Sequence, residues 1–384
     1  MERLLTKYAA KLVADGLADE GAPLLGGLDA ELVFNRTDPG TEILEQVFAG
    51  LNVNSLLACR PAEPYGSMID YLATRGRDAI EPRDTETRTY LHDLPIVPER
   101  GAAALVGALR RRKSAIVPGG EVVTFGTVSP EQAFVSYSSV CFACYVKFMA
   151  DCLADHRTGG IPADAREILD RALSLVERPP DRMPAVLRGP FDDAEQVHRA
   201  LIEAGRLTVE HRMVDSYFGN ISYRAGDTLF ISQTACSLDE LSGCIDPCPL
   251  DGSSSTGITA SSELSAHLEI IDRTGCRAIL HGHPKFAVIV SLDCELPDCE
   301  NAHRCHTHCT QPRAIGDVPI VAGEVGTGRY GLHRTVPPAF EDARGVIVYG
   351  HGLFTIGDVD FTDAARDLFA IEGRCIDEFV RRVG

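Results

Sequence analysis

The chain contains the same strand-and-turn pattern twice, and this internal repeat limits its possible folds more than any other feature. Residues 114–126 read SAIVPGGEVVTFG, and residues 345–357 read GVIVYGHGLFTIG. Each segment runs into a predicted helix. Five of the thirteen aligned positions are identical, namely Ile116/Ile347, Val117/Val348, Gly119/Gly350, Thr124/Thr355 and Gly126/Gly357.

A second pair of segments lies upstream in the same order. Residues 56–61 (LLACRP) align with residues 279–284 (ILHGHP), and the spacing from this proline to the repeated glycine is 58 positions in the first half and 66 in the second. The sequence therefore predicts two fused copies of one α/β domain. Chance similarity between two apolar strand–turn–helix units is the alternative.

The second copy carries a histidine pattern that the first lacks. Side chains alternate along a strand, so His281 and His283 point to the same face of the strand that ends in His-Gly-His. His351, in the turn of the second repeat, can supply a third nitrogen. Three neutral nitrogens with an open position suit a catalytic metal, whereas a structural zinc site is closed by four ligands. Ala58, Arg60 and Gly120 stand at the corresponding positions of the first copy.

Composition sets broad limits on the partners. The 384 residues carry a formal charge of −18, which disfavours nucleic acid and anionic membranes. Residues 1–13 read as an amphipathic helix with no signal-peptide pattern, and we expect no apolar run of membrane-spanning length. The 13 cysteines are an odd number, which indicates reduced thiols or metal ligands and a cytoplasmic protein.

Glycine and proline clusters divide the chain. We expect a degenerate domain without metal ligands over residues 1–155, a linker with a helical stretch over 156–190, and a catalytic domain over 191–384. In the last segment, helical spacing begins near residue 192, and short strands are predicted at 219–223, 228–231, 277–281 and 345–349.

The motifs of the second half, taken together, resemble the class II aldolase/adducin family. They are Gly219-Asn220-Ile221-Ser222, Ile231-Ser232-Gln233-Thr234-Ala235, Ser261-Ser262-Glu263, the His-Gly-His strand and Gly350-His351-Gly352. The resemblance covers about residues 191–384, with a weaker echo over about 40–155. It implies a three-layer α/β/α fold around a largely antiparallel sheet, in tandem here with the first copy degenerate, and a homo-oligomer with active sites near subunit interfaces.

The resemblance also implies roles for single residues. His281, His283 and His351 would bind a divalent metal, most commonly Zn²⁺, with Mn²⁺ or Fe²⁺ as alternatives. Glu263 would be the acid/base, and the metal would stabilise an enediolate formed from a keto-alcohol. An anionic tail, such as the phosphate of a sugar phosphate, would be held by donors from Asn220, Ser232, Thr234, Ser261 and Ser262, the last two preceding a predicted helix.

The chain departs from the family pattern in two places. Family phosphate loops carry Thr-Gly where this chain has Thr234-Ala235, so a Cβ stands where the backbone would approach an anion. Sugar-phosphate aldolases also use a tyrosine acid, and this chain has no tyrosine after Tyr349. Tyr330 and Tyr223 are the candidate substitutes.

The first copy is shorter than the second by 8 positions between the repeated blocks, and a cysteine-rich insert accounts for the difference. The insert, residues 294–309, contains four cysteines and His303, His306 and His308. Four thiolates can close a second, structural metal site, although no Cys-x-x-Cys pair is present. A solvent-facing loop of reduced thiols is the alternative. The four candidate ligands are Cys294, Cys299, Cys305 and Cys309.

The sequence thus favours a metal-dependent lyase of the aldolase type, which cleaves or forms a C–C bond in a keto-alcohol with or without a phosphate. Epimerisation, dehydration or decarboxylation on the same metal-held enolate is the first alternative. A non-catalytic, adducin-like binding protein is the second.

Overall fold

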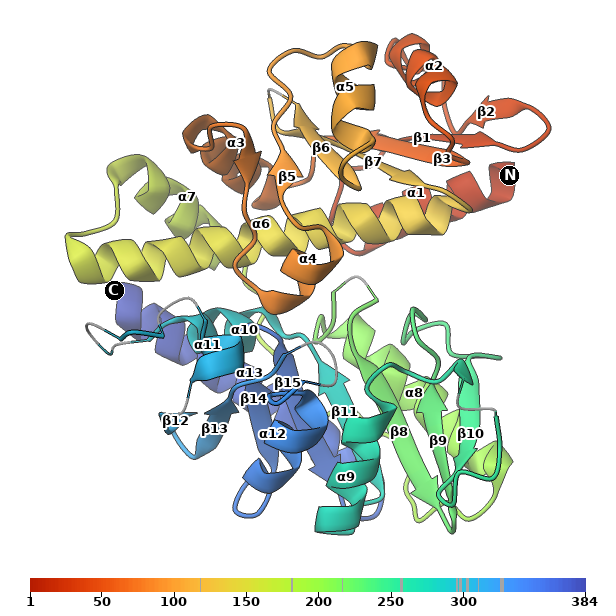
Figure 1. Cartoon of the computed structure of the whole chain (residues 1–384), viewed down its shortest axis with the longest axis vertical. Coiled ribbons are helices and arrows are strands. Elements are labelled where there is room, and N and C mark those ends of the chain that lie inside the picture. The colour runs from red at the N-terminus through yellow and green to blue at the C-terminus, as the bar shows by residue number, and fades with distance from the viewer. Residues whose placement is uncertain are drawn as a thin grey trace. The chain divides into compact units, whose positions relative to one another are not determined.

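The computed structural model describes residues 1–384 except 118, 181, 216, 256–257, 295, 297–298, 302–303, 310 and 325–327. It divides into two compact units, Met1–Val176 and Glu177–Gly384. The boundary falls inside the segment 156–190 that we predict as a linker. Each unit is described by itself below (Figure 1).

The first unit is built on an antiparallel sheet with the strand order β2-β1-β3-β7-β6 among the described residues. A short pair, β4 and β5, follows α3, and a parallel bridge from Ile96 to Ile116 joins it to β6. The strands are β1 (Leu24–Leu28), β2 (Leu32–Phe34), β3 (Ser55–Cys59), β4 (Ala79–Ile80), β5 (Leu94–Pro95), β6 (Ser114–Val117) and β7 (Glu121–Gly126). The helices are α1 (Glu2–Ala14), α2 (Thr41–Gly50), α3 (Tyr65–Arg75), α4 (Thr85–Tyr90), α5 (Ala102–Leu109), α6 (Pro130–Thr158) and α7 (Ala163–Ser174).

Helices cover both faces of this sheet (Figure 1). Leu44 of α2 and Leu105 of α5 pack with Leu56 and Val123 on one face. Helix α6 packs against β3 and β7, and α1 packs against β1 and α6. A sheet that is apolar on both faces requires such a cover on each side, which gives three layers.

Helix α6 corrects one expectation from the sequence. Over its 29 residues it is long and apolar enough to cross a membrane by length and composition, although we expected no such run. In the structure, 89% of its most apolar window is buried. A helix that is apolar all round suits the interior of a globular unit, and Phe134, Phe142 and Phe148 of α6 are buried in this one.

The second unit has an eight-stranded sheet in its described part, with the order β10-β9-β8-β11-β15-β14-β13-β12. Neighbours in this sheet are antiparallel except β13 and β14. The strands are β8 (Asn220–Ala225), β9 (Thr228–Ser232), β10 (Ile245–Pro249), β11 (Ala278–Gly282), β12 (Arg313–Ile315), β13 (Val318–Val321), β14 (Gly345–Val348) and β15 (Gly352–Gly357). The helices are α8 (Ala194–Glu210), α9 (Leu264–Thr274), α10 (Lys285–Leu292), α11 (Cys305–His308), α12 (Leu332–Ala339) and α13 (Phe361–Val383).

This sheet also lies between two layers of helices. On one face, Ile270 of α9 and Val336 of α12 pack with Ile279, Val346 and Phe354 of the central strands. On the other, α13 packs against β11 and β15, and α8 packs against β8 (Figure 1). The predicted three-layer α/β/α arrangement around a largely antiparallel sheet is therefore present in this half of the chain.

The two units place their elements in the same order. In the first, helix α1 precedes β1 and β2, α2 precedes β3, α3 follows it, and α5, β6, β7 and α6 come in that order before α7 ends the unit. In the second, α8 precedes β8 and β9, α9 precedes β11, α10 follows it, and α12, β14, β15 and α13 end the unit. The central strands also pair alike, since β3 lies between β1 and β7 as β11 lies between β8 and β15.

Candidate metal centre

Glycines allow two strands to meet closely where the histidines lie. A Cβ on Gly282 would lie 2.6 Å from the carbonyl oxygen of Met213, and one on Gly352 would lie 2.5 Å from that of Gly282. Gly350 has a φ of 59°, in the left-handed region that favours glycine. These residues bring the end of β11 next to the turn before β15, which places His351 beside His281.

The three histidines converge through their Nε2 atoms. The Nε2 of His281 lies 2.9 Å from that of His283 and 3.2 Å from that of His351. Each of the three residues is 1% exposed. Among the residues that the structure describes, this is the one group of three or more His, Cys, Asp or Glu side chains with all ligand atoms within 4.8 Å of one another.

The hydrogen bonding of His281 prepares its Nε2 for a metal. Its Nδ1 lies 3.2 Å from the carbonyl oxygen of Leu353, which can only accept a hydrogen bond. The proton of the neutral ring therefore sits on Nδ1, and the Nε2 lone pair faces the other two imidazoles. Tetrahedral zinc with Zn–N distances of about 2.0–2.1 Å separates its nitrogens by about 3.4 Å. The observed separations fit such an ion after a small expansion.

Burial favours the neutral form of His283, which is the form that a metal ligand requires. Burial lowers the pKa of His283 well below its ordinary value, and charge on His281 or His351 would lower it further. The ring of Phe218 stacks on that of His283 with a centroid distance of 5.6 Å. The ring of His283 is thus predisposed to bind a cation rather than a proton.

Glu263 is the acidic residue beside the triad. It stands at the N-cap position of α9 without a capping side-chain hydrogen bond. Its Oε1 lies 3.1 Å from Nε2 of His351, and its Oε2 lies 3.4 Å from Nε2 of His281. Burial alone would raise the pKa of Glu263. Two effects outweigh burial and hold this pKa below its ordinary value: positive charge on His281 and His351, and the hydrogen bonds from His351 and Asn220. A metal cation at the same nitrogens acts in the same direction. Glu263 is therefore an ionised carboxylate that can accept a proton.

Asn220 contacts Glu263 and is in turn held by two residues that our reading of the sequence missed. Its Nδ2 donates to Oε2 of Glu263 over 2.9 Å. Its Oδ1 lies 2.5 Å from Nε2 of His267, and Nδ1 of His267 lies 2.7 Å from Oγ of Ser222. The helical spacing contained a signal for His267, because it follows Glu263 by four positions and so lies one turn further along the same face of α9.

The remaining candidates for anion binding lie around the start of α9. Ser232 is buried, and its Oγ accepts the backbone N–H of Ile221. Ser261 is buried and its Oγ accepts the N–H of Glu263, whereas Thr234 and Ser262 are exposed. Their binding of an anionic tail stays a prediction.

Ala235 stands where the family pattern has glycine, and its backbone has a conformation typical of glycine. Ala235 has a φ of 59°, so the loop keeps a conformation that glycine adopts without strain.

Of the two candidate tyrosines, Tyr223 is committed elsewhere. It is fully buried, its hydroxyl donates to the carbonyl oxygen of Val359, and the N–H of Phe191 donates to it. It pairs with Ala278, at the opposite end of β11 from His281. Tyr330 lies beside Glu324, to whose Oε1 it donates its N–H. The structure therefore removes Tyr223 from the list of acids.

The cysteine-rich insert does not form a comparable centre in its described part. Cys305 is buried, and Cys294, Cys299 and Cys309 are half-buried. Burial raises the pKa of Cys305, with Cys309 and Cys294 acting in the same direction. His303 lies outside the described residues. A second metal bound by these cysteines stays a prediction.

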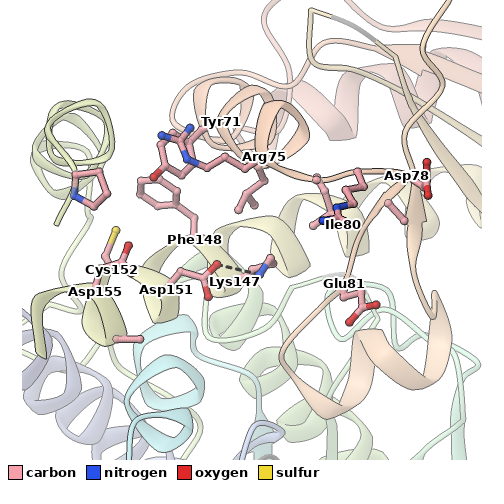
Figure 2. Close-up of a pocket in the computed structure, with 16 residues that line it drawn as sticks. Tyr71, Arg75, Asp78, Ile80, Glu81, Lys147, Phe148, Asp151, Cys152 and Asp155 are labelled. Atoms are coloured by element: carbon pink, nitrogen blue, oxygen red, sulfur yellow. Dashed lines mark hydrogen bonds and ion pairs between the residues drawn. The ribbon is translucent and has the colours of Figure 1, made fainter. Parts of the chain in front are cut away.

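A cavity of about 670 Å³ lies in the first unit, away from all predicted site residues. Tyr71 and Arg75 of α3 and Lys147, Asp151 and Asp155 of α6 line it (Figure 2). Asp151 pairs with both Lys147 and Arg83. The described residues of the cavity include no cluster that could hold a metal ion.

The fold and site together define a three-layer α/β unit with a buried three-histidine centre and an adjacent carboxylate. Residues 199–376 match the family model for the Class II Aldolase and Adducin N-terminal domain. This part of the second unit is therefore a domain of the class II aldolase and adducin family. The first unit lies outside the match.

Solved structures give distant similarities. The L-fuculose-1-phosphate aldolase of Thermus thermophilus is 23% identical, with a TM-score of 0.39 over 49% of this chain and 95% of that one. YgbL of Escherichia coli, a putative aldolase/epimerase/decarboxylase, is 18% identical, with a TM-score of 0.40 over 48% and 89%. A class II aldolase domain from Thermoplasma acidophilum is 16% identical, with a TM-score of 0.37 over 53% and 99%. No curated protein sequence matches the chain.

Proposed function

We propose that the second unit is a metal-dependent lyase of the aldolase type, acting on a keto-alcohol with or without a phosphate. One observation carries the proposal: the carboxylate of Glu263, whose side chain is 14% exposed, lies within 3.4 Å of two of the three converging imidazole nitrogens. His281, His283 and His351 would hold a divalent cation, for which Zn²⁺ suits three nitrogen ligands. When bound, the cation supplies Lewis-acid stabilisation of negative charge on the substrate oxygens.

Glu263 would then move the proton. In the condensing direction its carboxylate takes a proton from the carbon beside the carbonyl, and the electron pair left behind forms the new C–C bond to an aldehyde carbon. The aldehyde oxygen takes up a proton as the bond forms. Cleavage is the reverse, with Glu263 returning its proton to carbon. Epimerisation, dehydration and decarboxylation share the deprotonated substrate, so product analysis separates them from aldol chemistry.

Proton exchange with solvent tests this function without knowledge of the aldehyde partner. The zinc-loaded full chain is incubated in D₂O with dihydroxyacetone or dihydroxyacetone phosphate, and deuterium at carbon is followed by NMR. We expect Glu263→Gln to keep its metal and to lose exchange by about 10²- to 10⁴-fold. Glu269→Gln, at an exposed glutamate of the same helix, is the matched control. Equal exchange in Glu263→Gln and the wild type would refute the role of Glu263.

A non-catalytic, adducin-like role makes the opposite prediction. A binding protein would take up the two ketones without deuterating them, and neither glutamate variant would change that. The ionised carboxylate of Glu263 beside three converging imidazoles favours the enzyme, because a largely enclosed charge is costly unless a cation or hydrogen-bond donors pair with it.

We also propose that the first unit is a degenerate copy of the second. Arg60 stands in the place of His283, and its guanidinium binds Asp70 and the carbonyl oxygen of Gly119. A Cβ on Gly120, in the place of His351, would lie 2.5 Å from Nη1 of Arg60. An arginine side chain therefore fills the position of the third ligand, and the pairing order shared by the two sheets supports a common origin.

The domain limits 1–155, 156–190 and 191–384, a homo-oligomeric assembly and a cytoplasmic location remain part of the proposal. Light scattering of the purified chain measures the assembly directly.

A further inference from the structure

A buried chain of hydrogen bonds runs to Glu263 from the interior of the second unit. Ser222 on β8 contacts His267 on α9, His267 contacts Asn220 on β8, and Asn220 contacts Glu263. The side chains of Ser222 and His267 are fully buried, and Asn220 is 6% exposed. The metal-ligand triad does not include these three residues.

The chemistry of the groups fixes the direction of every bond. An ionised carboxylate can only accept, so Asn220 must turn its NH₂ toward Glu263 and its Oδ1 toward His267. Oδ1 can only accept, so Nε2 of His267 must carry the proton. In a neutral ring Nδ1 is then an acceptor, and the hydroxyl of Ser222 donates to it. Each donor in the chain thus points toward Glu263.

His267 stays neutral, which preserves this order. Burial lowers its pKa to about 3, although the negative charge of Glu263 acts in the opposite direction. A protonated ring would have no acceptor for the Ser222 hydroxyl. Buried polar groups are costly unless they are hydrogen-bonded, and these three bond to one another and to the carboxylate.

The first unit shows that the fold does not need these residues. In its sheet Leu24 pairs with Ala58 and Gly26 with Leu56, as Asn220 pairs with His281 and Ser222 with Ile279. Leu24 and Gly26 thus take the places of Asn220 and Ser222.

The helices before the central strands correspond without a gap. Gly40 stands at the N-cap position of α2, and Glu263 stands at the N-cap position of α9. In each unit the central strand, β3 or β11, begins 15 positions after this residue. Leu44 therefore takes the place of His267, and it is buried with Leu24 in the apolar core. The unit without the three histidines has replaced the carboxylate and the whole hydrogen-bond chain with glycine and leucine.

We propose that His267, oriented by Ser222, is a positioning residue that holds the Asn220 amide and through it the carboxylate of Glu263. The inference rests on the proposed function of Glu263 as acid/base. Asn220 fixes one oxygen of the Glu263 carboxylate. The carboxylate is therefore held in a single orientation beside His281 and His351. A base held in one orientation reacts faster than one that must be oriented during the reaction.

Two substitutions of His267 test the proposal in the zinc-loaded full chain. His267→Leu installs the residue found in the first unit and removes both hydrogen bonds. His267→Gln retains an N–H that can reach Oδ1 of Asn220. We expect His267→Leu to keep its zinc and to slow deuteration of dihydroxyacetone phosphate by about 10- to 100-fold, in kcat rather than KM, and His267→Gln to recover most of the rate. His198→Leu removes an imidazole that bonds within its own helix α8 and serves as the control.

NMR provides a readout that needs no turnover. In the zinc-loaded wild type, ¹⁵N spectra should show His267 as the neutral Nε2–H tautomer. The Asn220 side-chain amide protons should be protected from solvent exchange, and His267→Leu should remove that protection. An Nδ1–H tautomer, unchanged Asn220 protection in His267→Leu, or a rate for His267→Leu equal to that of His198→Leu would each overturn the proposal. If the wild type deuterates neither ketone, the proposed function fails, and the two NMR measurements still decide whether His267 holds Asn220.

Discussion

Asn220 and His281 are direct cross-strand partners in the antiparallel ladder between β8 and β11. One pairing register therefore places both the amide that binds Glu263 and the first imidazole of the triad. A slip of one residue would turn both side chains to the opposite face of the sheet. The register of two central strands thus fixes the relative positions of the carboxylate and the histidines.

The first prediction concerns metal content. The zinc-loaded and desalted wild type should contain one equivalent of zinc per chain, measured by inductively coupled plasma mass spectrometry. His281→Ala should lose it, because two imidazoles leave an incomplete and solvent-accessible site. Cys305→Ser should keep it. An equivalent that survives His281→Ala and disappears in Cys305→Ser would instead establish a second centre in the insert.

The second prediction concerns the strained loop at Ala235. A non-glycine residue in the left-handed region destabilises the fold by about 1–2 kcal/mol, and glycine removes this strain. Glycine also raises the conformational entropy of the unfolded chain, which offsets part of the stabilisation. Ala235→Gly should therefore raise the free energy of unfolding by about 0.5–1 kcal/mol in urea titrations. Ala370→Gly, at an exposed position inside α13, should lower it by about 1 kcal/mol. Equal losses in both variants would mean that Ala235 is not strained.

The third prediction concerns pH. Glu372 of α13 is 4% exposed and accepts the backbone N–H groups of Phe286 and Ala287 at the start of α10. Burial raises its pKa from 4.5 to about 7, and these bonds offset burial only in part. The folded chain therefore binds more protons than the unfolded chain between these values. The contribution of Glu372 to stability should be greatest below pH 4.5 and should fall as the pH rises toward 7.

Glu372→Gln isolates this effect, since glutamine does not titrate. The unfolding free energy of the wild type minus that of the variant should fall by up to about 3 kcal/mol between pH 4.5 and pH 8. Urea unfolding at several pH values measures the difference. A difference that rises with pH would show that the two backbone N–H groups and the helix N-terminus keep Glu372 ionised.

The fourth prediction uses a glycine that both repeats share. A Cβ on Gly357 would collide with the carbonyl oxygen of Asp360, and one on Gly126 would collide with that of Ser129. Both alanine variants should be destabilised by about 1–3 kcal/mol, because a backbone carbonyl cannot move aside as a side chain can. Gly373 lies inside α13 with no atom within 4 Å of a built Cβ, so Gly373→Ala should be stabilised by about 0.5–1 kcal/mol. Thermal unfolding of the three variants gives the comparison.

The local pattern was sufficient for the main strands of the second half. The strands predicted at 219–223, 228–231, 277–281 and 345–349 overlap β8, β9, β11 and β14, since buried apolar residues bounded by glycine and polar turns define them. The convergence of the three histidines follows from the two glycine-flanked turns that carry them. The prediction that no apolar run reaches membrane-spanning length was wrong for α6, which is long and apolar enough by composition. Composition does not show that this helix is buried inside a unit.

By itself, the sequence determined the similar segments of its two halves, the family of residues 199–376 and the residue types around the centre, because these depend on neighbours along the chain. Only the tertiary structure decided that Asn220 binds Glu263 and that His267, bound by Ser222, binds Asn220. It also decided that the Arg60 side chain fills the position in the first unit that corresponds to the third histidine. The donors and acceptors of these hydrogen bonds lie on a strand and a helix that are about forty residues apart in the sequence. Their pairing depends on sheet register and helix packing, which no local pattern encodes.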